Sequence, residues 1–312
     1  MAGVIETRGL RKRYRRVEAL RGLDLEVPAG SICGFLGPNG AGKTTTMRIL
    51  MGLIRPSEGW ASVLGDDIDG NGMATRSRIG YLPQDPSYFS RATVRNTLRF
   101  VARRYLAGSR GAVNERVDET LELVGLSDRA DRKVKVLSGG ERRRLGIGQA
   151  VIGDPDLLIL DEPSVGLDPE GRSQVLDLLE SLKERMTIFY SSHILDDVER
   201  VADHVLVLDH GEIIEQGPMK SFLGGGAATY RVRFDGDGEA TIDSLAREPW
   251  ISMTRLIEPG VWEIGIANRE AAEHDLLRTL HGFDGTRVTE LRPQQRDLED
   301  IYLDLVGAGD DE

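Results

Sequence analysis

Short apolar runs alternate with longer amphipathic stretches over the first two thirds of the chain. Four apolar runs have the length and continuity of buried strands, at residues 32–36, 157–161, 186–191 and 205–209. Helical periodicity is found between and after these runs, at residues 43–53, 171–185 and 194–202. Because buried strands that alternate with helices form parallel sheets covered on both faces, the pattern predicts an α/β fold.

Two further regions modify this picture. Residues 4–10 and 23–27 predict antiparallel edge strands near the N-terminus, so the expected sheet is mixed. Residues 91–131 carry no strong strand signal and predict a helical insert, which we place at about 91–137.

The pattern changes after a run of three glycines and two alanines at residues 224–228, which is the most flexible composition in the chain. Beyond it we expect strand, helix, strand, strand, helix, strand, at residues 230–234, 240–248, 251–257, 261–267, 269–281 and 286–292. This is the order of elements in ferredoxin-like domains. A last amphipathic helix is expected at 296–306, before an acidic tail at 307–312. The sequence thus predicts a domain at 1–223, a linker at 224–228 and a small α+β domain at 229–312.

Composition and charge narrow the class of protein. The 312 residues exceed the roughly 250–300 that one core usually holds, which supports two domains. No run approaches the roughly 18 apolar residues of a transmembrane helix, and residues 1–9 lack the apolar core of a secretory signal. The net charge of −11 disfavours general nucleic-acid binding. Since Cys33 is the one cysteine, no intramolecular disulfide can form, and the cytosol is the expected compartment.

A glycine-rich segment follows the first apolar run. Residues 37–44 match the pattern G-x-x-x-x-G-K-[ST], with a strand before the match and a helical pattern from Lys43 onward. Here glycines turn backbone N–H groups inward, and the start of the helix favours anions. We expect Lys43 to contact the β- and γ-phosphates of a nucleotide and the Thr44 hydroxyl to ligate Mg²⁺. The residues expected to bind the nucleotide are Gly37, Pro38, Asn39, Gly40, Ala41, Gly42, Lys43, Thr44 and Thr45.

Two carboxylates end a second apolar run. Residues 157–160 read Leu-Leu-Ile-Leu and lead directly into Asp161 and Glu162. Since ligands of open α/β sheets bind at the C-terminal edge of the strands, both carboxylates are expected beside the phosphate site. Asp161 is expected to hold Mg²⁺, directly or through water, and Glu162 to accept a proton from an attacking water. The structural alternatives are a glycine-rich turn beside a chance Lys-Thr pair, and a surface Asp-Glu pair that caps a strand.

A third motif lies between these two. Residues 137–141 read Leu-Ser-Gly-Gly-Glu and resemble the signature motif in the ATP-binding subunits of ABC transporters. Ser138 is expected to begin a helix, with Gly139 and Gly140 exposing N–H groups where a helix start attracts anions. The resemblance implies that this helix start faces the γ-phosphate bound by a second protomer, so that a monomer lacks half of its site.

The resemblance implies roles for four more residues. Gln84, in Tyr-Leu-Pro-Gln, is similar to the glutamine that senses Mg²⁺ and the attacking water. Asp168 resembles the aspartate of the loop that crosses the dimer interface, and His193 resembles the switch histidine that contacts the γ-phosphate. Tyr14 stands where the family has an aromatic residue that stacks on adenine. A surface tyrosine and a structural histidine are the alternatives for the last two.

The resemblance covers residues 3–222 and implies an α/β P-loop ATPase domain of the ABC type. Within the family, Asn39-Gly40-Ala41, Thr44-Thr45-Thr46-Met47 and residues 298–303 look most like ATPases of ABC-2-type exporters. That subgroup includes multidrug, antibiotic-resistance, sodium and polysaccharide exporters. Ser164 stands where the family often has threonine, and both residues carry a hydroxyl.

The resemblance also implies cofactors and partners. We expect an active ATPase that uses ATP and Mg²⁺, pairs with a second copy or a close relative, and energises a separate transmembrane permease. It would then lie at the cytoplasmic face of the cell membrane. The permease is expected to dock near Gln84 and residues 85–97, where Tyr88 and Phe89 are candidate contacts, with packing inside the helical insert as the alternative.

Three questions stay open at this point. An importer subunit would share every catalytic residue named above. A soluble ABC ATPase acting on ribosomes or DNA is disfavoured, because the chain has one cassette and no sustained heptads between the motifs. The domain at 229–312 is either a regulatory small-molecule binder or a dimerising or stabilising appendage, and fold analogy alone does not decide between them.

Overall fold

The computed structural model describes residues 3–68, 72–106, 109–223, 228–235, 238–267, 276, 279–280, 287–294 and 297–307. The chain divides into two compact units, one of Met1–Met219 with Leu305–Glu312 and the other of Lys220–Asp304. The expected linker at 224–228, the helix at 269–281 and the tail at 307–312 lie largely outside the described residues.

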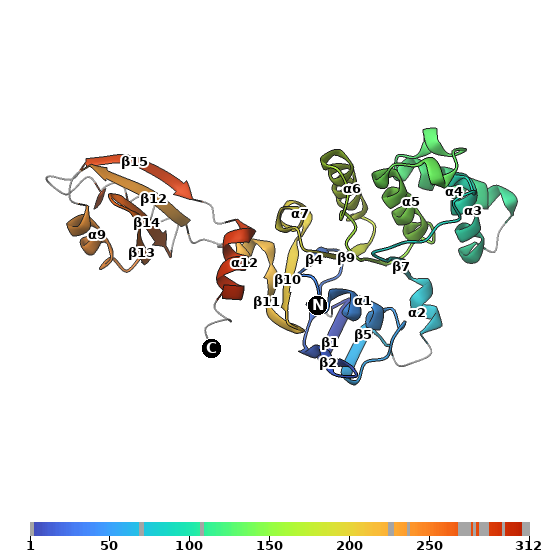
Figure 1. Ribbon diagram of the computed structural model, residues 1–312, viewed down its shortest axis with the longest axis horizontal. Helices are drawn as coiled ribbons and strands as arrows, with labels where there is room; N and C mark the ends of the chain where they lie inside the picture. The colour runs from blue at the N-terminus through green and yellow to red at the C-terminus, as the bar shows by residue number, and fades with distance from the viewer. Residues whose placement is uncertain are drawn as a thin grey trace. The chain divides into compact units, whose positions relative to one another are not determined.

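Six strands form the central sheet of the first unit, in the order β11-β10-β4-β9-β8-β7 (Figure 1). Their bounds are Glu212–Pro218, His204–Asp209, Ile32–Leu36, Thr187–Ser192, Leu157–Leu160 and Ile79–Leu82, in that order. β11 is antiparallel to β10, and every other pair is parallel. All residues of β4, β8 and β9 and the four central residues of β10 are buried, which confirms the four predicted core strands and the α/β class. The sequence pattern missed β7, which has four residues, and β11, which is largely exposed.

A second sheet corrects the prediction for the N-terminus. Its order is β2-β1-β5-β6, with β3 paired to β1, and all pairs are antiparallel. The bounds are Ile5–Tyr14 (β1), Val17–Leu23 (β2), Glu26–Val27 (β3), Glu58–Val63 (β5) and Asp66–Asp67 (β6). Residues 4–10 are therefore not an edge strand, because β1 has neighbours on both sides. The antiparallel strand expected at 23–27 is confirmed only at its end, since Leu23 ends β2 and β3 begins at Glu26.

The helices of the first unit follow the predicted order. They are α1 Lys43–Leu50, α2 Met73–Ser77, α3 Val94–Tyr105, α4 Arg110–Leu123, α5 Gly139–Val151, α6 Pro169–Leu182 and α7 Leu195–Val201, and α8 Met219–Phe222 follows. α3 and α4 confirm the helical insert. α1 ends three residues earlier than predicted, and Gly52 beyond it adopts a φ of +65° that favours glycine. Met47 of α1 shares one core cluster with Ile5 of β1 and Phe35 of β4, so α1 packs against both sheets.

The second unit contains a four-stranded antiparallel sheet in the order β13-β14-β12-β15. The strands are Ala228–Asp235 (β12), Ile251–Glu258 (β13), Val261–Ile266 (β14) and Arg287–Gln294 (β15), with α9 at Glu239–Leu245. α12, at Leu298–Gly307, begins in this unit, and its residues from Leu305 onward are assigned to the first unit. Val232, Ile242 and Ile264 share its core cluster. The predicted strands are confirmed to within two residues, and the ferredoxin-like topology stays a prediction.

Candidate functional site

The glycine-rich segment joins the C-terminal end of β4 to the start of α1. Gly42, immediately before α1, has a φ of +118°, and a Cβ at this position would lie 2.6 Å from Leu20 Cδ2 and 2.8 Å from the Ala19 carbonyl oxygen. Only glycine fits this backbone. The loop borders a cavity of about 310 Å³, lined by residues 38–40, Gly42, Lys43, Thr44, Thr45, Ala19, Gln84 and Glu162.

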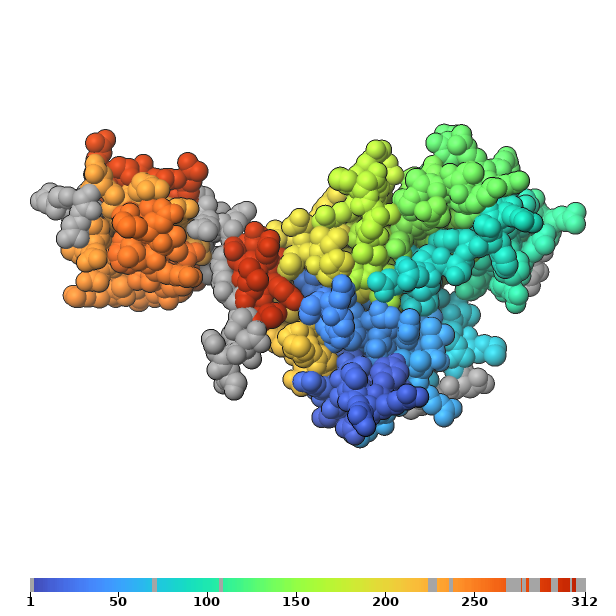
Figure 2. Space-filling model, in the orientation of Figure 1, coloured from blue at the N-terminus to red at the C-terminus, as the bar shows by residue number. Residues whose placement is uncertain are grey.

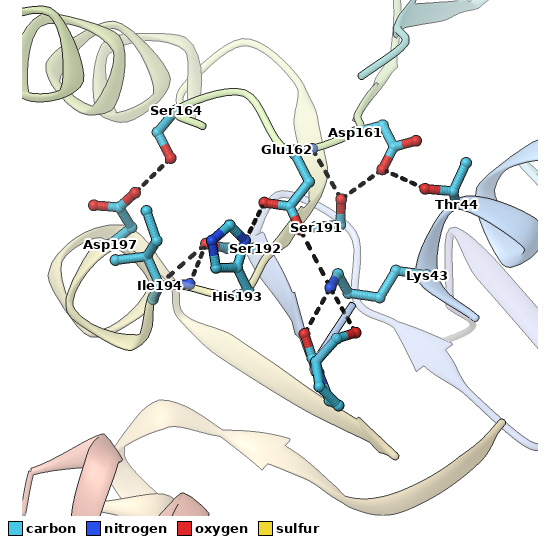
Figure 3. A network of polar contacts seen from close by, with 12 residues as sticks. Lys43, Thr44, Asp161, Glu162, Ser164, Ser191, Ser192, His193, Ile194 and Asp197 are labelled. Atoms are coloured by element: carbon cyan, nitrogen blue, oxygen red, sulfur yellow. Dashed lines mark hydrogen bonds and ion pairs between the residues drawn. The ribbon is translucent and has the colours of Figure 1, made fainter. Parts of the chain in front are cut away.

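Lys43 lies at the inner wall of this cavity and is 5% exposed. Its ammonium group donates hydrogen bonds to the carbonyl oxygens of Gly37 (2.6 Å) and Pro38 (3.2 Å). It also forms an ion pair with Glu162 Oε1 at 3.2 Å (Figure 3). A buried ammonium group at the N-terminus of a helix can bind phosphate oxygens, because both the positive charge and the helix N–H groups attract anions.

Asp161 follows β8 and reaches the start of α1. Its Oδ1 accepts hydrogen bonds from the Ser191 hydroxyl (2.9 Å) and the Thr44 hydroxyl (3.1 Å). Its Oδ2 is buried and has no hydrogen-bond partner among the described residues. Burial raises the pKa of Asp161, against the lowering effect of the bonds from Ser191 and Thr44. An unpaired carboxylate oxygen beside a threonine hydroxyl suits a hard cation such as Mg²⁺, which prefers oxygen ligands.

Glu162 is held in an unusual backbone conformation. Its φ is +51°, in the left-handed region that few residues other than glycine adopt. Its N–H donates to the Ser191 hydroxyl at 2.9 Å. The carboxylate is 4% exposed, and its Oε2 lies 2.9 Å from Nδ1 of His193 (Figure 3). The surrounding contacts therefore fix both the backbone and the carboxylate of Glu162.

Sequence reasoning missed Ser191, although it contacts both carboxylate residues. The side chain is fully buried, and its hydroxyl donates to Asp161 while accepting from the Glu162 N–H. β8 and β9 pair in parallel with Leu160 opposite Tyr190, so the next residues along each strand are neighbours. The available signal was a serine at the end of an apolar strand, two residues before His193.

The signature segment lies elsewhere in the same unit. Ser138 caps α5: its hydroxyl accepts from the Glu141 N–H (3.1 Å), and its own N–H donates to Glu141 Oε2 (2.8 Å). The pKa of Glu141 is lowered: partial burial raises it, but the bonds from the Ser138 N–H and from Arg129 outweigh burial. This confirms that Ser138 begins a helix, with Gly139 and Gly140 as its first two residues.

Asp168 caps the neighbouring helix in the same way, accepting from the Gly171 N–H at 3.1 Å. α5 and α6 approach closely at their starts, since a Cβ on Gly140 would lie 3.2 Å from Gly171 Cα. In the described part of the chain, Ser138, Gly140 and Asp168 are not among the residues that line the Lys43 cavity. Within one chain, the structure thus brings Lys43, Thr44, Asp161, Glu162, Gln84 and His193 together, and Ser138 and Asp168 lie apart from them.

Gln84 and Tyr14 occupy different positions relative to the cavity. Gln84 lines it, and its carbonyl oxygen accepts from Arg143 of α5 at 3.1 Å, a contact that the sequence did not predict. Tyr14 ends β1 at the turn into β2 and is 44% exposed, with the Lys12 ammonium group 5.1 Å from the ring centroid. The residue of this hairpin that lines the cavity is Ala19.

Comparison with known proteins places this arrangement among nucleotide-binding cassettes. The ABC transporter family model matches residues 20–165. The chain is 38% identical to Nod factor export ATP-binding protein I of Cupriavidus metallidurans, with 98% of each chain covered. It is 37% identical to the daunorubicin/doxorubicin resistance ATP-binding protein DrrA of Streptomyces peucetius (97% of this chain, 92% of the relative). Identity to the bacitracin transport ATP-binding protein BcrA of Bacillus licheniformis is 33%, with 99% of each covered.

Solved structures agree on the fold. The structure of cbiO1 from Clostridium perfringens, part of an ABC transporter complex, matches with a TM-score of 0.66 and 29% identity, over 80% of this chain and 97% of that one. A dimeric ATP-binding cassette bound to ADP and Pi matches with a TM-score of 0.63 over 69% of this chain and 98% of that one, and its 22% identity supports the fold alone. Among the described residues, every helix is too short or too polar to cross a bilayer.

Proposed function

Because the chain belongs to the ABC transporter family, we propose that it is the ATP-binding and ATP-hydrolysing subunit of an exporter whose membrane-spanning permease is a separate chain. The observation that carries this proposal is that Lys43, Thr44 and Glu162 line one cavity, with Asp161 hydrogen-bonded to Thr44. Relatives similar over almost their whole length are named for Nod factor export and for daunorubicin/doxorubicin resistance, which favours export over import.

Hydrolysis in this proposal depends on a buried carboxylate held beside the phosphate site. Lys43 and the N–H groups of the glycine-rich loop bind the phosphates, and Glu162 accepts the proton of the attacking water. His193, hydrogen-bonded to Glu162 through Nδ1, orients that carboxylate and is placed to contact the γ-phosphate. Gln84, on the cavity wall, orients the water.

The oxygen atoms at the end of β8 fit a magnesium ion. Thr44, Asp161 and Gln84 would hold it, and the unpaired Oδ2 of Asp161 is the observation that supports the assignment. When bound, the ion would neutralise charge on the β- and γ-phosphates. Tyr14 is proposed to stack on the adenine ring from the β1–β2 turn, where its ring is partly exposed.

Two copies of the chain complete each other's sites in this proposal. Ser138, Gly139 and Gly140 lie apart from the Lys43 cavity of their own chain, and the start of α5 offers N–H groups to an anion. We assign these residues to the γ-phosphate bound by the partner, and Asp168 to the loop that crosses the dimer interface. The chain would be peripheral to the membrane through its permease. We also propose an ATPase domain at 1–223 and an accessory domain at 229–312: the division of the chain near Met219 supports the first boundary, although residues 305–312 group with the first unit.

The proposed permease contact is the surface near Gln84 and residues 85–97, which leads into the helical insert (Figure 2, teal to green). Tyr88 serves a structural role there, because its hydroxyl donates to the Arg142 carbonyl oxygen at 2.9 Å and burial raises its pKa to about 12. Phe89 is 71% exposed and packs edge-on against Phe100, which is 53% exposed. Exposed aromatic pairs are typical anchors of protein interfaces. Phe89 is therefore the better candidate of the two.

Phe89→Asp should abolish co-purification with the permease, because a carboxylate would have to be desolvated against the partner. Met73→Asp is the matched control, since Met73 is also 71% exposed but lies on α2. The measurement is the amount of permease retained by the tagged chain after detergent extraction, with basal ATPase activity as a check on folding. Equal retention by the two variants would exclude this docking surface.

A further inference from the structure

A buried carboxylate on α7 is not part of the site described above. Asp197 lies in the first turn of α7 and is fully buried. Its Oδ2 accepts from the Ser164 hydroxyl at 2.5 Å (Figure 3), and its Oδ1 accepts from Arg172 Nε in an ion pair. Its carbonyl oxygen accepts from the Tyr190 hydroxyl at 3.2 Å. A buried charge is tolerated only with such partners, so these contacts fix the position of Asp197.

The partners of Asp197 come from the segments that carry the proposed site residues. Ser164 lies two residues after Glu162. Arg172 lies in the first turn of α6, the helix that Asp168 caps. Asp197 itself lies four residues after His193. One carboxylate therefore links the segment that follows Glu162, the helix that Asp168 caps and the helix that follows His193.

The backbone of Asp197 also constrains the loop that contains His193. Tyr190 stands three residues before His193 on β9, and its bond to the Asp197 carbonyl oxygen spans the loop. Inside the loop, the Ser192 hydroxyl contacts both backbone polar groups of Ile194. These contacts hold His193 where its Nδ1 lies 2.9 Å from Glu162 Oε2. Glu162 has a strained backbone, which persists only where the surroundings fix it.

We propose that Asp197 is a positioning residue for ATP hydrolysis: through Ser164 and Arg172 it holds the segments of Glu162, His193 and Asp168 in one arrangement without touching the nucleotide. The proposal rests on the roles proposed above for Glu162 and His193. A small displacement of a general base and of the group that orients it lowers kcat without weakening the ground-state binding of the substrate. A purely structural ion pair between α6 and α7 would instead affect thermal stability and leave the rate per folded molecule unchanged.

Asp197→Asn keeps the size of the side chain and removes the charge that pairs with Arg172. We expect kcat for ATP to fall by about 10- to 100-fold, as for a small misplacement of reacting groups, while KM and the ATP dissociation constant stay within about twofold. If this variant fails to fold, two smaller substitutions at Ser164 test the same contact. Ser164→Ala should lower kcat in the same way, and Ser164→Thr, which restores a hydroxyl, should recover it.

The chain offers a matched control. Arg200 and Asp177 form a second ion pair between α7 and α6, at 2.6 Å, and both side chains are exposed. Asp177→Asn should leave kcat unchanged. A wild-type kcat in folded Asp197→Asn and Ser164→Ala, or an equal loss in Asp177→Asn, would overturn the inference.

Glu162→Gln is measured in the same assay to separate the two proposals. If that variant stays active, the proposed role of Glu162 fails, and the positioning role of Asp197 fails with it. If it is inactive while the Asp197 and Ser164 variants turn over normally, only the positioning role fails.

Discussion

Glu162→Gln should reduce kcat for ATP by about 10²- to 10⁴-fold, the usual contribution of general base catalysis. The amide keeps the size of the side chain and its contact with His193, but it cannot accept the proton of the attacking water. Nucleotide binding should persist, because Lys43 and the glycine-rich loop are unchanged. The variant should therefore accumulate bound, uncleaved ATP.

The measurement is single-turnover hydrolysis together with retention of labelled ATP after gel filtration. Glu170→Gln serves as the control, since Glu170 is an exposed carboxylate in the first turn of α6. Normal turnover by Glu162→Gln would remove Glu162 as the base.

Lys43→Ala should weaken ATP binding by about 10- to 150-fold, because a charge-assisted hydrogen bond contributes about 1.5–3 kcal/mol. Lys43→Ala should raise the ATP dissociation constant, whereas Glu162→Gln should lower kcat, so the two variants are distinguished by which of these quantities changes. The substitution also leaves the buried Glu162 carboxylate without its ion-pair partner at 3.2 Å, and we expect a lower Tm as well.

Isothermal titration with ATP and a thermal melt measure the two effects. Lys183→Ala is the control: Lys183 is paired with Asp203 at 2.5 Å but is 42% exposed and distant in sequence from the glycine-rich loop. ATP affinity equal to that of the wild type in Lys43→Ala would contradict the phosphate-binding role of this segment.

Those parts of the site that depend on local pattern were predictable from the sequence. The glycine-rich turn into α1 and the carboxylates after β8 each have a strong local signal, and parallel strands bring their C-terminal ends to one edge. The structure places Asp161 within hydrogen-bond distance of Thr44, 117 residues earlier in the chain. Parallel pairing accounts for this long-range contact.

Contacts that depend on which strands are neighbours could not be predicted. Ser191 contacts Asp161 and Glu162 because β9 pairs with β8, and a sequence pattern does not give strand order. The sequence pattern does not distinguish Asp197 from an exposed acidic residue of an amphipathic helix. Its burial and its ion pair with Arg172 depend on how α7 and α6 pack. The second sheet was missed for a similar reason, since β5 begins with three exposed residues and lacks a clear alternating pattern.

We propose that each ATP is bound between two copies of the chain, by the glycine-rich loop of one and the Ser138 helix of the other. At an ATP concentration that saturates the wild type but lies below the dissociation constant of Lys43→Ala, homodimers of Lys43→Ala and of Ser138→Arg should each have little activity, because both sites of each dimer lack one half. Mixing the two variants should restore about a quarter of wild-type ATPase activity, since half of randomly paired dimers are mixed and each mixed dimer has one intact site of two. A mixture that stays inactive, or full activity of Ser138→Arg alone, would show that the two chains do not share their ATP sites.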